Sequence, residues 1–137
     1  MSLRRGLAVC LLLVILSGCG QKAAHYKTVP VSGVLTCQGN AVAKVFVIFT
    51  PQASKDRPEG ASGKSAMGQT DETGKFVLST YGMNDGAVPG MHTVTIMIVD
   101  DPQYPVPADT KKKIAPCLSG VTKIEVAPGM SEVQLKF

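Results

Sequence analysis

From Val31 to the end of the chain, short apolar runs alternate with clusters of turn residues, and within the runs apolar and polar positions alternate with a period of two. This period places successive side chains on opposite faces of a β-strand. Strands are therefore predicted over 31–37, 42–50, 66–70, 75–80, 91–99, 121–127 and 132–136. No window after Val31 carries an apolar stripe at helical spacing. Seven short strands separated by turns favour an all-β, seven-stranded Greek-key sandwich.

The alternation also predicts which side chains form the core. Two strands are apolar on one face only, and their predicted core residues are Val94, Ile96, Ile98, Val133, Leu135 and Phe137. The 42–50 strand differs, because Phe46 and Ile48 make its second face apolar as well. A strand that is apolar on both faces suits a central position in a sheet or cover by a loop.

The turns between the predicted strands have recognisable chemistry. The segment 71–74 fits a type I turn with a bulge, because Asp71 can cap the turn and Gly74 can adopt a positive φ. Residues 37–40 are expected to connect the first two strands in the same way.

The first eighteen residues have the organisation of a secretory signal peptide. Arg4 and Arg5 precede an apolar stretch over 7–16, which ends in the small residues Ser17 and Gly18. Ten helical residues span about 15 Å, half of the roughly 30 Å hydrocarbon core, so a transmembrane helix is disfavoured. The residues around the arginine pair do not fit the twin-arginine pattern, which favours the general secretory route.

The end of this segment resembles the lipobox of bacterial lipoproteins: a Leu, a small residue, a Gly or Ala, and then Cys. The matching residues are Leu16, Ser17, Gly18 and Cys19. The resemblance implies that the Cys19 thiol is joined to a diacylglyceryl group, that cleavage occurs before Cys19, and that its new amino group is acylated. Gly20 is not the Asp that resembles an inner-membrane retention signal, so an outer-membrane location, facing the periplasm or the cell surface, is expected.

These features divide the chain into a signal peptide over 1–18, a lipidated tether over 19–30 and one domain over 31–137. The alternative for the N-terminus is an ordinary secretory signal with an incidental Cys. Removing the signal takes two arginines away and leaves 12 basic and 10 acidic side chains, so the mature chain is nearly neutral. Because the chain also has no Trp, neither phosphate binding nor base stacking is expected, and nucleic acid is not a predicted partner.

Four segments of the domain, 31–35, 39–42, 70–76 and 86–92, combine strand starts with turn residues. The last of these contains Pro89 and Gly90 just before an alternating strand. In these segments the domain resembles the carboxypeptidase regulatory-like, transthyretin-like β-sandwich. More narrowly, the chain is similar to small lipoproteins of planctomycete-type bacteria that carry this domain alone. The resemblance implies an extracytoplasmic module with an immunoglobulin-like or prealbumin-like sandwich, and it brings no catalytic residue.

Two cysteines remain once Cys10 has left with the signal peptide and Cys19 has been acylated. In an oxidising compartment, Cys37 and Cys117 are expected to form a disulfide. The two cysteines are 80 positions apart. Closing a loop of that length stabilises the folded state by about 4 to 5 kcal/mol on the chain-entropy model. The alternative is a redox pair or a metal-thiolate site, but the chain has no CxxC spacing and no His close to either residue.

Neither histidine is predicted to act in catalysis or metal binding. His25 lies in the tether without further ligands nearby and is expected to be solvated. His92 begins an alternating strand and is expected to be an imidazole at one end of the sandwich, hydrogen-bonded to backbone. A hydrolase with His92 as its base is disfavoured, because the chain has no nucleophile elbow such as GxSxG.

Charged clusters have solvated turns as their simplest interpretation. Asp71, Asp85 and the pair Asp100-Asp101 are conceivable calcium ligands, but no loop has the spacing of an EF-hand. The lysine run 111–113 is expected to be solvated, with weak attraction to anionic lipid as the alternative.

The residues therefore predict a non-catalytic interaction or structural module, without cofactor or metal, held at the cell envelope through Cys19. The long connections 51–65 and 100–120, or an edge strand, are expected to contact an envelope protein or a glycan. The alternative function is a small-ligand binder or a transthyretin-like oligomeric carrier.

Overall fold

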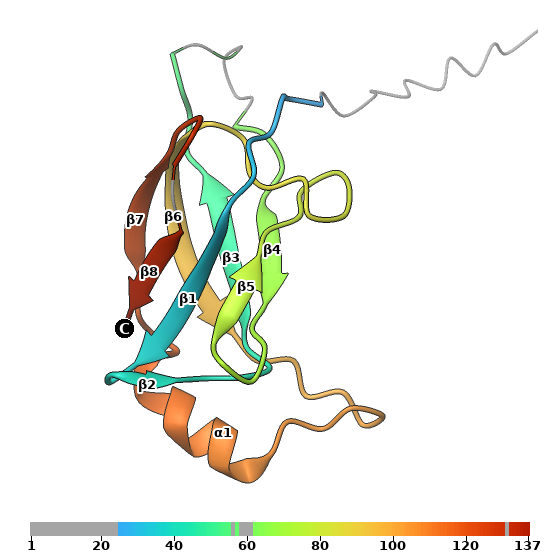
Figure 1. The fold of residues 1–137 in the computed structure, drawn as a ribbon, viewed down its shortest axis with the longest axis vertical. Coiled ribbons are helices and arrows are strands. Elements are labelled where there is room, and N and C mark those ends of the chain that lie inside the picture. Colours follow the sequence, from blue (N-terminus) through green and yellow to red (C-terminus); the bar gives the residue numbers. More distant parts are fainter. Residues whose placement is uncertain (1–24, 56, 58–61, 131) are drawn as a thin grey trace, which may run out of the picture.

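The computed structural model describes residues 25–55, 57, 62–130 and 132–137. This part of the chain forms eight strands, one α-helix and one 3-10 helix (Figure 1). Their bounds are β1 Ser32–Cys37, β2 Asn40–Ala41, β3 Phe46–Pro51, β4 Ala66–Gln69, β5 Lys75–Val77, β6 Gly90–Met97, α1 Ala108–Ile114, η1 Ala115–Cys117, β7 Thr122–Val126 and β8 Val133–Lys136. The expected signal peptide over 1–18 and the predicted acylation site Cys19 lie outside the described residues.

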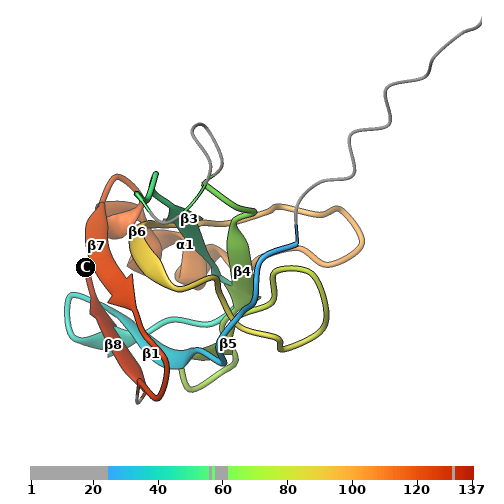
Figure 2. The same ribbon diagram turned by 90° about the horizontal axis from the view of Figure 1, so that it is seen from above.

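The strands form two sheets that face each other as a β-sandwich, which confirms the predicted all-β class (Figure 2). In the first sheet, β1 pairs antiparallel with β2 and β5 and parallel with β8. In the second sheet, the order is β4-β3-β6-β7 and every neighbouring pair is antiparallel. Strands β4 and β5 are consecutive in the chain but belong to different sheets, so the chain changes layers at the turn between them.

Apolar side chains from both sheets fill the space between the layers. The largest wholly buried ones include Phe49, Leu35, Leu78, Ile114 and Leu135. Burying a side chain of this size stabilises the fold by roughly 1.5 to 3 kcal/mol. All residues that alternation placed in the core lie in it or pack against it: Val94, Ile96, Ile98, Val133, Leu135 and Phe137.

Strand β3 is central in its sheet, as its two apolar faces predicted. It begins at Phe46 rather than at residue 42, because Lys44 adopts a φ of 58°, which interrupts extended backbone. The preceding residues form instead the short strand β2 and a loop, so the number of strands exceeds the predicted seven by one. Phe46 and Ile48 point outward from β3 and stay partly exposed.

The prediction that no helix follows Val31 is wrong, because helix α1 lies within the predicted 100–120 loop. The helix has only seven residues and buries only Ile114, so it is too short to show an apolar stripe. Weaker signals were present. Pro107 precedes the first turn, Asp109 lies within that turn, and three lysines occupy the last turn, as the helix dipole favours.

The two ends of the sandwich are built from different segments (Figure 1). One end receives the chain from the tether, and we call it the tether end. There Val29 is 9% exposed and exchanges backbone hydrogen bonds of 2.9 and 3.0 Å with Ala87. The last residues of the expected 19–30 tether therefore pack as part of the domain. The opposite end carries β2, α1 and η1.

Candidate interaction surface

Strands β3, β4 and β6 present an outer surface on which no described side chain is charged. Because side chains alternate along a strand, the residues between the buried ones point away from the core. We call this surface the uncharged face, and it consists of Phe46, Ile48, Thr50, Met67, Gln69, Met91, Thr93, Thr95 and Met97. Lys, Glu, Asp and Arg are the residues most often found at exposed positions, so their absence from three adjacent strands is a distinctive feature.

The strand register gathers the apolar members of the uncharged face. Phe46 on β3 is opposite Met97 on β6, and Ile48 is opposite Met67 on β4. Directly opposed side chains have Cβ atoms about 5 Å apart, which is close enough to pack. Met67 and Met97 remain 44% and 39% exposed, while Phe46 and Ile48 are half-buried. The result is one continuous apolar patch that is open to solvent.

Polar and charged groups lie along the β7 side of the uncharged face. On β7, Lys123 lies opposite Thr93 and Glu125 lies opposite Met91, and both charged residues are exposed. The Gln52 side-chain amide donates a hydrogen bond of 2.9 Å to the Thr93 hydroxyl. Apolar residues with polar residues at the margin are typical of a protein interface.

A groove of about 670 Å³ adjoins the uncharged face on its β4 side. Its lining includes Phe46 and Met67 from the uncharged face, Phe76 and Val77 from β5, and the charged residues Asp71 and Lys75. The groove lies where the two sheets diverge, since β4 pairs with β3 and β5 pairs with β1. The two segments nevertheless stay close, because the Gly68 backbone lies against the Val77 carbonyl group and Met67 forms an isolated bridge with Ser79, just after β5. Together, the groove and the uncharged face form the candidate interaction surface.

The turn between β4 and β5 closes one end of this region. The Asp71 carboxylate accepts hydrogen bonds from the backbone N–H and the hydroxyl of Thr73, at 2.8 and 2.7 Å, and from the Lys75 N–H at 3.0 Å. These bonds, the Thr73 hydroxyl first among them, hold the pKa of Asp71 below its ordinary value. Gly74 adopts a φ of 79°, which glycine allows without strain.

Pro89 and Gly90 lie where the chain enters β6. Gly90 has a φ of 120° and pairs with Val126 of β7. The Arg57 guanidinium donates hydrogen bonds to the carbonyl groups of Pro89 and Ser62. Part of the long 51–65 connection is thereby fastened to the tether end.

His92 lies within the core, with 0% of its surface exposed. Its Nδ1 is 2.9 Å from the carbonyl oxygen of Gly90. Because a carbonyl only accepts, Nδ1 carries the proton, and Nε2 makes no hydrogen bond to any residue that the structure describes. The ring packs against Phe49, with 5.9 Å between ring centres. This arrangement agrees with the expected imidazole hydrogen-bonded to backbone and shows in addition that the ring is buried.

Burial has the largest effect on the ionisation of His92 and lowers its pKa. The hydrogen bond to Gly90 opposes this change, and the positive charge of Arg57 lowers the pKa further. The neutral imidazole is therefore the form that the folded protein favours.

The opposite end of the sandwich is held by the predicted disulfide. Cys37, the last residue of β1, is bonded to Cys117, the last residue of η1, and their Cα atoms are 6.0 Å apart. The bond spans 80 positions of the sequence. It attaches α1 and η1 to the sheet that contains β1.

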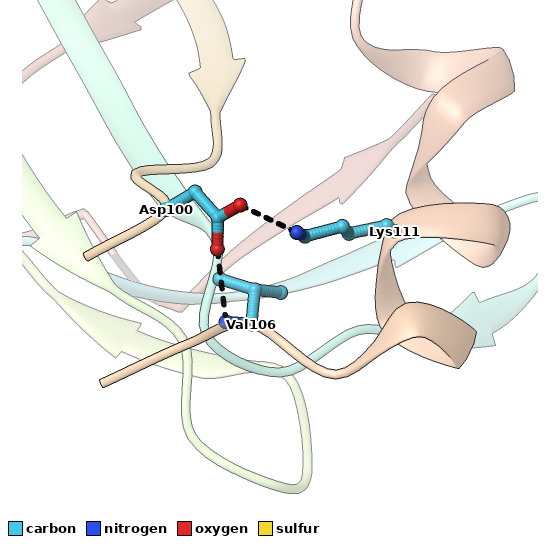
Figure 3. A network of polar contacts seen from close by, with 3 residues as sticks. All are labelled: Asp100, Val106 and Lys111. Atoms are coloured by element: carbon cyan, nitrogen blue, oxygen red, sulfur yellow. Dashed lines mark hydrogen bonds and ion pairs between the residues drawn. The ribbon is translucent and has the colours of Figure 1, made fainter. Parts of the chain in front are cut away.

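An ion pair fastens the same helix to the preceding loop (Figure 3). Lys111 Nζ is 2.6 Å from Asp100 Oδ2, and Asp100 Oδ1 accepts a hydrogen bond from the Val106 N–H at 3.4 Å. The Lys111 ammonium lowers the pKa of Asp100. The interpretation of Asp100 and of the lysine run as wholly solvated groups therefore needs correction, since one lysine of the run is paired.

The other aspartates considered as calcium ligands hold separate turns. Asp101 accepts a hydrogen bond from the Gln103 N–H at 2.7 Å, and Asp85 accepts three from its own loop. In the part of the chain that the structure describes, no three His, Cys, Asp or Glu side chains are placed to hold a metal ion.

No helix among the described residues has both the length and the apolar character needed to cross a bilayer. No protein-family model, no curated protein and no solved structure matches this chain.

Proposed function

We propose that this chain is a lipoprotein of the cell envelope whose β-sandwich is a non-catalytic interaction module. In this proposal, Cys19 follows the lipobox-like residues Leu16, Ser17 and Gly18, carries the acyl chains and attaches the domain to the outer membrane. The domain is of the carboxypeptidase regulatory-like kind, with a Greek-key course of strands. The change of sheets between β4 and β5 supports that course, because it carries the chain from one layer of the sandwich to the other.

The observation that carries the proposal is the uncharged face with its adjoining groove. Exposed apolar side chains that are scattered singly need no explanation, but a contiguous patch bordered by polar residues is typical of an interaction site. The centre of a protein interface is depleted of charged residues and enriched in aromatic residues and Met. Phe46, Met67 and Met97 fit that composition.

The partner is an envelope protein or a glycan that makes apolar and hydroxyl contacts. Threonine hydroxyls and methionine side chains offer such contacts, whereas a strongly charged partner would find no opposite charge on this face. Anchoring confines the module near the membrane and so raises its effective concentration towards a partner in the same compartment. This proposal assigns the partner contact to a sheet surface that includes the edge strand β4, and not to the long connections, which were the other expected contact region.

A photo-crosslinking amino acid at position 97, introduced in intact cells, tests this proposal. The matched control carries the same amino acid at position 134, because Gln134 is an exposed position of β8 in the other sheet. We expect discrete crosslinked products from position 97 and none from position 134. The products are then identified by mass spectrometry.

Each of four outcomes is informative. Products from position 97 alone support the interaction face. Equal products from both positions, or none from position 97, contradict it. A product that contains two copies of this chain favours the oligomeric carrier instead, and light scattering after size-exclusion chromatography then measures the number of copies.

A further inference from the structure

Aromatic residues fix the direction in which the chain leaves the tether end. The His25 ring stacks on Tyr81 with 4.3 Å between ring centres, and the Tyr26 N–H donates to the Tyr81 hydroxyl at 3.3 Å. The Arg57 guanidinium lies 5.6 Å from the centre of the Tyr26 ring. With Val29 paired to Ala87, these contacts hold the segment from residue 25 onward against the domain. The chain therefore departs from one defined place on the tether end.

A braced loop lies beside this exit. The Asp85 carboxylate accepts hydrogen bonds from the N–H groups of Thr80, Tyr81 and Gly82, at 2.6, 3.0 and 3.0 Å. Burial raises the pKa of Asp85, but these three bonds outweigh burial, and the pKa is lowered. The loop therefore keeps its shape with an ionised carboxylate at its centre.

Met83 occupies the tip of this loop and is 90% exposed, the most of any large apolar side chain that the structure describes. Its loop is held in place, so the side chain cannot fold back onto the core. Water solvates such a side chain poorly, whereas the boundary between headgroups and acyl chains accepts it.

Basic residues surround the same exit. Lys27 and Lys64 are exposed, and the Lys64 ammonium lies 6.0 Å from the centre of the Tyr81 ring. In sequence the 51–65 connection also contains Asp56 and Glu59, so its own basic residues are partly balanced by acidic ones. The exposed Met83 side chain and the place where the chain leaves the domain are therefore the main evidence for a contact with lipid. The lysines add attraction to phosphate groups.

The length of chain outside the described residues limits how far the domain can be from its anchor. Six peptide units separate Cys19 from His25, and even when fully extended they span at most about 20 Å. Strand β6 alone, with eight residues, is about 27 Å long. The anchor therefore keeps the tether end close to the bilayer and leaves the α1 end free to point away.

We propose that the tether end is a membrane-contacting surface, with Met83 inserted at the headgroup level and Lys27 and Lys64 against lipid phosphates. The inference rests on the proposed acylation of Cys19. It places the lysine run 111–113 at the end away from the bilayer, contrary to the alternative that the run contacts anionic lipid (Figure 1). It also leaves the uncharged face, on the side of the sandwich, open to a partner.

The test uses the full mature lipoprotein in phosphatidylcholine vesicles, with and without phosphatidylglycerol. Met83→Cys carries an environment-sensitive fluorophore, and Ala108→Cys, an exposed position at the start of α1, is the matched control. We expect the label at position 83 to become several-fold brighter on reconstitution and to be quenched by lipids that carry a nitroxide in the headgroup. The label at position 108 should respond to neither, and Lys64→Glu should reduce the quenching at position 83 only when phosphatidylglycerol is present.

Labelling and mass measurement of the wild-type protein distinguish a wrong membrane-contacting surface from a wrong assignment of the lipid anchor. The disulfide consumes Cys37 and Cys117, so an acylated wild-type protein takes up no label and shows acyl mass. A protein without that mass overturns both proposals. An acylated protein in which labels at positions 83 and 108 behave alike overturns the membrane-contacting surface and leaves the anchor standing.

Discussion

At the scale of single residues, His92 combines complete burial with a ring nitrogen that has no hydrogen-bond partner among the described residues. Protonating Nε2 would place a positive charge in the core, where Arg57 is the charged group whose field reaches the ring. The unfolded chain pays no such penalty and takes up the proton near the ordinary pKa of about 6.5. Stability should therefore depend on pH through this residue.

The sign follows from proton linkage. The pKa of His92 is lowered in the folded state, so the folded protein favours the neutral ring more than the unfolded chain does. The folded state therefore suffers no loss of stability from His92 above about pH 6.5, and its free energy of unfolding falls progressively as the pH drops below that value. We expect the free energy of unfolding to fall by at most about 1.4 kcal/mol per pH unit between pH 6.5 and pH 5. Denaturant unfolding at a series of pH values measures it.

Two variants test whether His92 causes this pH dependence of the free energy of unfolding. His92→Asn keeps an N–H donor for Gly90 and removes the titrating ring, so the slope between pH 6.5 and pH 5 should flatten. Gln134→Asn, at an exposed position of β8, should keep the wild-type slope. An unchanged slope in His92→Asn would show that another group controls the acid response.

At the scale of the elements, the close approach of β4 and β5 depends on Gly68. A Cβ atom at this position would collide with the backbone carbonyl oxygen of Val77. We expect Gly68→Ala to lower the free energy of unfolding by about 1 to 3 kcal/mol, because backbone cannot move aside as a flexible side chain can. Gly82→Ala is the control, since its nearest atom is a side-chain oxygen of Asp85 at 4.0 Å. Equal stability of both variants would contradict this account of the groove.

The attachment of α1 allows a comparison between two kinds of bond. Removing the disulfide by Cys37→Ala with Cys117→Ala should cost about 4 kcal/mol, because an 80-residue separation is bridged. Breaking the ion pair by Asp100→Asn should cost less than about 1 kcal/mol, because its side chains are 57% and 39% exposed and solvent screens them. Urea unfolding of both variants measures the two losses in free energy of unfolding. A larger loss for Asp100→Asn than for the double cysteine variant would show that the ion pair, and not the disulfide, is the main attachment of α1.

At the scale of the whole molecule, the anchor decides where the protein resides. Cys19→Ala removes the only proposed acylation site, so we expect the protein to move from the membrane fraction to the soluble fraction. Ser17→Ala keeps a small residue in the lipobox and should remain with the membrane. Each buried methylene contributes about 0.8 kcal/mol, so the loss of two or more acyl chains leaves no comparable attachment. Retention of Cys19→Ala in the membrane would refute the lipid anchor.

Several features of the fold could be predicted because they depend on neighbours in the chain. Alternation along β6 and β8 identified Val94, Ile96 and Leu135 as core residues, since the strand period alone decides which side chains share a face. The turn at Asp71 and Gly74 was recognisable from residue chemistry. The helix α1 was missed because seven residues with a single buried side chain carry no periodic signal.

The candidate interaction surface could be predicted only in part. The apolar second face of β3 was visible in Phe46 and Ile48, but their neighbours across the sheet were not. Met67 lies 19 positions after its partner Ile48 and Met97 lies 51 positions after its partner Phe46, and only strand pairing brings them together. The groove was likewise invisible, because it arises from two consecutive strands joining different sheets.

Local periodicity and residue chemistry were enough to predict most strands, the inward residues, the main turn and the cysteine pair, because these features need no distant partner. The pairing of strands into sheets, the position of the uncharged face and the projection of Met83 beside the exit of the chain became visible only in the folded molecule. These features depend on hydrogen bonds and packing between residues far apart in sequence. Such contacts are chosen by the energy of the whole fold and not by any single segment.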